Sequence, residues 1–361
     1  MGDNWPGEIT PQLVEAVSDT EPLACNATPR LGLGCIIDNV GVFRGCVLRR
    51  RGLTKNGNHD NKATPESATG ESQNFIHKAV RAFRSFAYGG EERHPRVGVA
   101  LGGGFARGIA HIGVLRILEA YGIPVDVVCG TSVGALVAAT YASGTPLGEM
   151  ERQGVETHFR DFGCWTISRM GMASNERLEH YLHKFTTKHL FSEMKVPLAI
   201  VATDLISGKT VYFTEGEIGP ALRASCAYPG LFLPVEHNGQ ILVDGFLTEL
   251  VPAVAARKMG ADIVISVHLE PGLLDTAPRN TIEIISRSFS ILQSSAVQSW
   301  RAATDVLIEP NVHHILWDEF AKTPQLVAAG EAAAQEAIPK IKELLAHRVR
   351  ETAPAGPRRN D

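Results

Sequence analysis

The chain has 361 residues, of which 44% are hydrophobic and 20% are charged, so it can bury one sizeable core or two small ones. Its formal net charge of -4 lacks the basic excess that nucleic-acid-binding proteins carry, so nucleic acid is not an expected partner. Its six cysteines form no CxxC pair. They therefore favour neither a zinc site nor a disulfide framework, and indicate reduced thiols in a cytoplasmic setting.

The N-terminal region lacks the basic start and apolar run of a secretory signal, and no stretch approaches the roughly 18 apolar residues of a membrane-spanning helix. We therefore expect a cytoplasmic protein whose membrane contact, if any, is peripheral at the inner membrane surface. Residues 1–72 are rich in Gly, Pro, Asn, Thr and Ser, which predicts a disordered or weakly ordered extension. Residues 73–94 predict an amphipathic helix and a linker, with packing on the domain favoured over a helix lying in a membrane interface.

From Arg96 onward, apolar runs of strand length alternate with segments of helix length. The strand candidates, in chain order, are RVGVAL, IPVDVVCG, VPLAIVATDL, KTVYFT, ADIVISVHL and DVLIEP. This alternation predicts a single α/β domain over 95–347, with three α/β/α layers and a mainly parallel central sheet. Residues 348–361 are expected to form a flexible tail.

A later segment, TIEIISRSFSILQSSAVQSW, also has the pattern of a helix. Its apolar residues recur at helical spacing at Ile282, Ile285, Phe289, Leu292 and Ala296. We expect this stripe to pack on the sheet rather than to line an acyl channel.

The stretch CGTSVGA joins a predicted strand to a predicted helix. Gly130 and Gly134 flank Ser132 in a Gly-x-Ser-x-Gly pattern. This pattern is typical of a sharp turn between strand and helix, called an elbow, that projects the serine hydroxyl. Free N–H groups at the start of the helix would favour negative charge on an oxygen bound there. Ser132 is therefore a candidate nucleophile, although a turn serine or a simple N-cap fits the same residues.

The loop LGGGFARG also follows a strand and opens a helix. It does not match the G-x-G-x-x-G pattern of dinucleotide-binding proteins, because Arg107 or Phe105 occupies a required glycine position. A glycine loop of this kind can instead form an oxyanion hole, with Arg107 adding positive charge nearby. Since the loop lies one strand and one helix before Ser132, both should emerge at the carboxyl ends of neighbouring strands.

Two kinds of catalytic base are compatible with the sequence. Asp204 or Asp244 could form a Ser-His-Asp triad with His268, His313 or His314, as in α/β-hydrolases. Alternatively, LVDG places Asp244 at a strand end among apolar neighbours, which would raise its pKa and make it a better base. A turn aspartate bonded to its own backbone also fits.

Together, GGGFARG, GTSVG and the later DG pair resemble the patatin-like phospholipases, especially the bacterial branch related to neuropathy target esterase. The resemblance covers about residues 96–310 and implies a patatin-like fold. It also implies that Ser132 is the nucleophile and Asp244 the base of a dyad without histidine, which cleaves lipid esters through an acyl-enzyme.

The same resemblance assigns expected roles to several glycines and one arginine. They are the oxyanion-hole positions Gly103 and Gly104 with Arg107 beside them, the elbow glycines Gly130 and Gly134, and the base-motif glycine Gly245. Neither a metal nor an organic cofactor is implied, and the expected partner is a lipid or another acyl ester. Phe105 and Phe246 depart from the family pattern, which could reshape the acyl pocket or the access to the base. A noncatalytic lipid-binding protein that keeps the fold remains an alternative.

Overall fold

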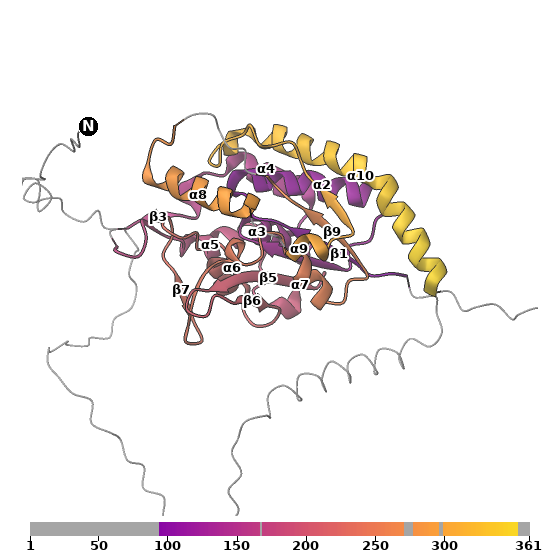
Figure 1. Ribbon diagram of the computed structural model, residues 1–361, viewed down its shortest axis with the longest axis horizontal. Helices are drawn as coiled ribbons and strands as arrows, with labels where there is room; N and C mark the ends of the chain where they lie inside the picture. The colour runs from indigo at the N-terminus through magenta and orange to yellow at the C-terminus, as the bar shows by residue number, and fades with distance from the viewer. Residues whose placement is uncertain (1–93, 167, 271–276, 296–298, 353–361) are drawn as a thin grey trace, which may run out of the picture. The chain divides into compact units, whose positions relative to one another are not determined.

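The computed structural model describes residues 94–166, 168–270, 277–295 and 299–352 (Figure 1). The extension predicted over residues 1–72 and nearly all of the helix and linker predicted over 73–94 lie outside the described residues. The last helix extends to Thr352, past the predicted end of the domain at 347, and the rest of the predicted tail also lies outside the described residues.

An eight-stranded mixed sheet forms the centre of the domain. Its strands, in spatial order, are β10 (Val306–Ile308), β9 (Ile263–Val267), β1 (Val97–Leu101), β2 (Val127–Thr131), β5 (Leu198–Asp204), β8 (Gln240–Asp244) and β7 (Val235–His237), while β6 (Thr210–Phe213) also pairs with β5. The run from β10 to β5 is parallel, whereas β6, β7 and β8 are antiparallel additions. The predicted α/β fold with a mainly parallel central sheet is confirmed.

Helices cover both faces of this sheet. They are α2 (Ala110–Ala120), α3 (Val133–Ser143), α4 (Leu147–Glu156), α5 (Arg177–Leu182), α6 (Ile218–Ser225), α7 (Ala253–Lys258), α8 (Thr281–Ser295), α9 (Ser299–Ala302) and α10 (Thr323–Thr352). Figure 1 shows α2 and α10 on one side of the sheet and α7 on the other. The strands therefore form the middle of three layers.

Both faces of β1 are buried, which explains why its sequence is a continuous apolar run. Val97, Val99 and Leu101 join the core on the side of α2 and α10, whereas Ala100 joins a second core beneath α7. All of these side chains are fully buried. A parallel strand covered on both faces needs apolar residues at every position, which is the pattern seen in RVGVAL.

A small hairpin lies outside the main sheet. Its strands are β3 (Cys164–Trp165) and β4 (Ala173–Ser174), which pair in antiparallel fashion, and Ala173 also bridges to Phe232. Among the described helices, none combines the length and the hydropathy that a bilayer-spanning segment needs.

Candidate active site

The turn around Ser132 is sterically tight. Ser132 has φ 57° and ψ -127°, a region that residues other than glycine rarely adopt, and α3 begins at the next residue. A Cβ added to Gly134 would lie 2.1 Å from the Leu101 carbonyl oxygen, and one added to Gly130 would lie 2.3 Å from the Ala135 Cα. Because neither position has room for a side chain, the backbone packing holds the serine in this conformation.

Asp244 lies beside Ser132 at the end of an antiparallel strand. The Ser132 hydroxyl donates a hydrogen bond to Asp244 Oδ2 at 2.7 Å, and the Phe246 N–H donates to Oδ1 at 3.0 Å. Asp244 is fully buried, and the resulting desolvation raises its pKa to about 7 although both hydrogen bonds lower it. The carboxyl group can therefore exchange a proton near neutral pH.

The following glycine permits this arrangement. A Cβ on Gly245 would lie only 2.4 Å from the Val201 carbonyl oxygen of β5, so the chain after Asp244 passes directly over the neighbouring strand. Since β5 separates β2 from β8 in the sheet, this close approach helps Asp244 to reach Ser132 across one strand.

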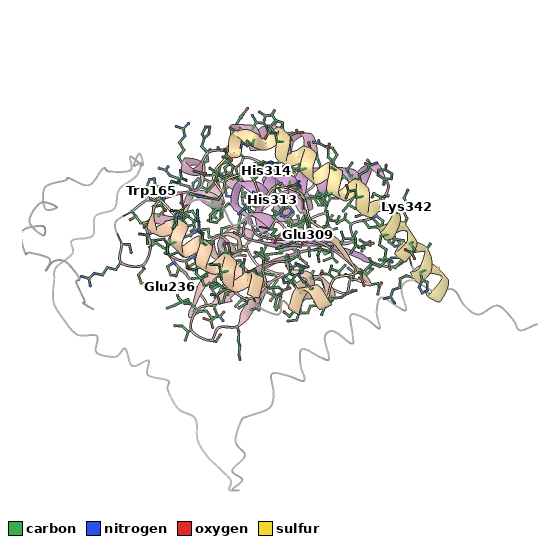
Figure 2. The ribbon with its side chains drawn as sticks, turned by 45° about the horizontal axis from the view of Figure 1, so that its top comes forward. Trp165, Glu236, Glu309, His313, His314 and Lys342 are labelled. Carbon is green, nitrogen blue, oxygen red and sulfur yellow. The ribbon has the colours of Figure 1, made fainter. Side chains whose placement is uncertain are left out.

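The candidate histidines make no hydrogen bond to Ser132 in the part of the chain that the structure describes. His268 Nδ1 lies 3.0 Å from Glu309 Oε1, and His313 and His314 follow Glu309 in the segment after β10 (Figure 2). His313 lines a cavity that also contains Ser132, but within the described residues no histidine ring is hydrogen-bonded to the serine. Asp204 bonds to Ser207 and other groups of its own turn.

His111, in α2, is hydrogen-bonded to the backbone of the glycine loop. Its ring is fully buried, and burial lowers its pKa to about 4, so the ring is neutral near pH 7. Nε2–H therefore donates to the Gly102 carbonyl oxygen at 2.8 Å. His111 thus fastens the start of α2 to the glycine loop through a buried hydrogen bond.

The N–H groups of the glycine loop point to different partners. The Gly103 N–H donates to the Leu250 carbonyl oxygen at 3.2 Å, whereas no backbone acceptor within the described chain binds the N–H of Gly104 or Phe105. Phe105 has φ 52°, a positive value that residues other than glycine rarely adopt and that changes the orientation of the adjoining peptide groups. The N–H groups open to a bound oxygen are therefore those of Gly104 and Phe105. Gly103 lies against the nucleophile, since a Cβ there would be 3.4 Å from the Ser132 Cβ.

Arg107 supplies positive charge beside this loop. Its Nε donates a long hydrogen bond to the Gly104 carbonyl oxygen at 3.4 Å. Desolvation lowers the pKa of the guanidinium, and among the described residues no carboxylate forms an ion pair with it. An anionic oxygen in the cavity would therefore meet a cation that is not already neutralised.

Ser225 is a site residue that the sequence reasoning missed. It is fully buried at the end of α6, and its Oγ accepts a hydrogen bond from the Ser132 N–H at 2.9 Å. The bond fixes the peptide that carries the nucleophile. A serine at the end of a helix carries no local sequence signal of such a contact.

Two cavities meet at the nucleophile. The larger, of about 520 Å³, is lined by the dyad, the glycine loop and polar residues such as Arg279 and Ser286. The smaller, of about 100 Å³, is lined almost entirely by apolar side chains, and Ser132 and Phe105 border both cavities.

The aromatic departures from the family pattern form part of the larger cavity's wall. The rings of Phe105 and Phe246 both pack on Tyr228, with centroids 4.9 Å away in each case. Phe289 of α8 packs on Phe246 at 5.2 Å and lines the same cavity. The expectation that the apolar stripe of this helix packs on the sheet is therefore wrong, because Phe289 faces the site and Leu292 is 63% exposed.

Nothing in the described part of the chain resembles a metal centre, since no three His, Cys, Asp or Glu side chains converge there. The chemistry available in the cavity is a serine hydroxyl, a buried carboxyl group, backbone N–H donors and an arginine. These are the groups required for acyl transfer to a serine.

Comparison with known proteins agrees with this geometry. The model of the patatin-like phospholipase family matches residues 99–257, a segment that contains both Ser132 and Asp244. An uncharacterized NTE family protein of Mycobacterium tuberculosis is 32% identical over 232 residues, which cover 59% of this chain and 60% of the relative. A lysophospholipase NTE1 of Mycosarcoma maydis is 33% identical over 196 residues, 51% of this chain but only 10% of that protein.

The chain thus spans about 60% of the length of the mycobacterial relative and much less of the fungal one. The family match lies on the strands, the elbow and the glycine loop described above, where the sequence pattern also pointed. Over residues 99–257 the chain is similar to the patatin-like phospholipase family, as the three sequence motifs indicated.

Proposed function

We propose that the protein is a lipid acyl hydrolase that cleaves carboxylic esters with a Ser132–Asp244 dyad. The observation that carries this proposal is the 2.7 Å hydrogen bond from the Ser132 hydroxyl to a buried carboxyl group whose pKa is about 7. A base with a pKa near the working pH accepts a proton efficiently and later returns it.

In the first half of the reaction, Ser132 Oγ attacks the ester carbonyl carbon while its proton passes to Asp244 Oδ2. The N–H groups of Gly104 and Phe105 would donate to the oxyanion, with Arg107 adding positive charge nearby. The tetrahedral intermediate then collapses, the bond to the alcohol breaks, and the leaving alkoxide takes the proton from Asp244. The acyl group remains on Ser132 as an ester.

In the second half, a water molecule gives a proton to Asp244 as its oxygen attacks the acyl-enzyme. The same N–H groups stabilise the second oxyanion. Collapse returns the proton to Ser132 Oγ and releases the carboxylic acid. Each proton transfer uses the one carboxylate, so the cycle needs no histidine.

The names of relatives favour lipid esters over other acyl compounds. The fungal relatives from Mycosarcoma maydis and Emericella nidulans are lysophospholipases, and the family model describes phospholipases. We therefore propose phospholipids and lysophospholipids, met peripherally at a membrane surface in the cytoplasm, as the natural substrate class. Simple carboxylic esters should serve as soluble substitutes.

A fluorophosphonate probe, which reacts covalently with activated serines, tests the nucleophile. We expect it to label the wild type and the Ser288→Ala control, which changes an exposed serine of α8, but not Ser132→Ala. Hydrolysis of soluble esters and of lysophospholipid should follow the same pattern. Equal hydrolysis by Ser132→Ala would refute the proposal, and labelling without turnover of any ester would favour the noncatalytic lipid-binding alternative.

A further inference from the structure

The smaller cavity at Ser132 has no part in the proton transfers described above. We propose that it binds the acyl chain of the substrate, while the leaving alcohol and its headgroup occupy the larger cavity. This inference rests on the proposed function, because the chain would be attached to Ser132 in the acyl-enzyme. The inference goes further than the proposed function in two respects. It assigns each half of the ester to one of the two cavities, and it sets the length of acyl chain that the protein recognises.

We call the smaller cavity the acyl chamber, or the chamber for short. One of its walls is formed by α3, the helix that begins directly after Ser132. Val133, Leu136, Val137 and Thr140 line it, and their spacing puts them on a single side of α3. Because α3 starts directly after Ser132, this stripe leads away from the reacting carbonyl over about 10 Å of helix. Met150 of α4 also lines the chamber. A chain bound to Ser132 Oγ could therefore run along α3.

The polar side chains of α3 and α5 in the wall of the chamber, together with Thr157 after α4 and Asn175, are hydrogen-bonded within the protein. The Thr140 hydroxyl donates to the Leu136 carbonyl oxygen at 2.8 Å, the Thr157 and Tyr181 hydroxyls bond to each other, and Asn175 Nδ2 donates to the Arg223 carbonyl oxygen at 2.7 Å. A polar headgroup bound there would lose its hydrogen bonds to water without gaining replacements, whereas an alkyl chain has no hydrogen bonds to lose. The larger cavity differs, because Arg107 and Arg279 line it.

The size of the chamber limits the chain that it can recognise. An apolar cavity of 150 Å³ binds benzene, so one of about 100 Å³ takes roughly four carbons. Each methylene buried from water should raise kcat/KM about fourfold until the chamber is full. We therefore expect kcat/KM to climb from acetyl to roughly hexanoyl esters and then to level off.

The test is a series of soluble esters, from acetate to octanoate, that share one leaving group and are used below their micelle concentrations. Val137→Phe fills the middle of the chamber and should lower the hexanoate-to-acetate ratio of kcat/KM at least tenfold. Thr140→Leu, farther from Ser132, should lower the octanoate-to-butanoate ratio and leave the butanoate-to-acetate ratio as in the wild type. Ala139→Val, which enlarges a buried residue of α3 outside the chamber, should keep every ratio at the wild-type value.

Two readouts separate this inference from the proposed function. A wild type that hydrolyses all esters at rates independent of chain length, or a Val137→Phe variant with wild-type ratios, would overturn the chamber assignment and leave the dyad intact. Binding gives a test without turnover: hexanoate should raise the melting temperature of Ser132→Ala but not of the Ser132→Ala/Val137→Phe double variant. Equal shifts in both proteins would also overturn the assignment.

Discussion

The two members of the proposed dyad come from parts of the sheet that are built differently. Ser132 follows a parallel strand, and its turn is held by backbone contacts so close that neighbouring glycines cannot carry a side chain. Asp244 ends an antiparallel strand, and burial together with two hydrogen bonds sets its chemistry. Sterics thus fix the nucleophile, whereas electrostatics tune the base. The predictions below test whether these two controls can be separated.

The largest effect should come from the base. Asp244→Asn keeps the shape of the side chain and an oxygen for the Phe246 N–H, but it cannot accept the serine proton. We expect kcat/KM for a soluble ester to fall by about 10³-fold, within the range that general base catalysis contributes. Steady-state kinetics on the purified variant measure this loss. If His313→Ala lost as much activity and Asp244→Asn little, the Ser-His-Asp alternative would replace the dyad.

The same variant should be more stable than the wild type in alkaline solution. The pKa of Asp244 is about 7 in the folded protein and 3.8 in the reference state, so its stabilising contribution is complete below pH 3.8 and is lost as the pH rises through 7. Asparagine is neutral throughout. Urea unfolding at pH 8 should show a gain of up to about 4 kcal/mol over the wild type, and the gain should shrink towards pH 4.

A substitution in the elbow should lower the free energy of unfolding of the protein. In Gly134→Ala the new Cβ would lie 2.1 Å from the Leu101 carbonyl oxygen, so the strand and the helix must move apart. We expect a loss of about 3 kcal/mol in the free energy of unfolding. Gly148→Ala is a matched control in α4, where a Cβ meets nothing within 4 Å, and it should leave stability equal or slightly higher. Equal losses in both would mean that close packing does not hold the elbow.

The pH profile should reveal the tuned base. Since the ionised form of Asp244 accepts the proton, kcat/KM should reach half its maximum near pH 7 and fall about tenfold per pH unit below that. His111 has a pKa of about 4 and would act only in more acidic solution. Circular dichroism across the same range checks that the fold persists. A profile that stays flat from pH 5 to 8 would contradict the assignment.

The smallest effect should come from the residue that links the two parts. Ser225→Ala removes the acceptor of the Ser132 N–H but no reacting atom. A single hydrogen bond of about 1 kcal/mol corresponds to about a fivefold loss in kcat. The loss should appear in kcat with KM little changed, because the bond positions the nucleophile and does not touch the substrate. A Ser225→Ala variant with wild-type kcat would show that the turn needs no such support.

Much of the parallel half could be predicted from the sequence. Strands β1, β2, β5 and β9 are buried at every position, and each therefore appears in the sequence as an apolar run. The elbow lies between one of these strands and an alanine-rich helix. The β7–β8 turn also carries a local signal, an Asn-Gly pair, and both Asn238 and Gly239 adopt positive φ. These signals are local, so a single sequence contains them.

The rest depends on contacts between distant segments. The side of the sheet on which β8 pairs, the hydrogen bond of Ser225 and the chamber along α3 each require packing that no short stretch encodes. The stripe of α8 was misjudged for the same reason, since its periodicity predicts a helix but does not identify what the apolar side faces. The Gly103 N–H likewise has a partner, the Leu250 carbonyl oxygen, that lies far away in the sequence.

The dyad joins residues 112 apart in the chain, and this separation has a consequence for folding and synthesis. The glycine loop and the elbow come from one continuous stretch, β1 to α3, which is made before the base segment. The serine has no base until β8 pairs with β5, a contact of high sequence separation that forms slowly. Under the proposed mechanism, a growing polypeptide would carry an inert serine, and hydrolysis would begin only after the base segment has been made and docked.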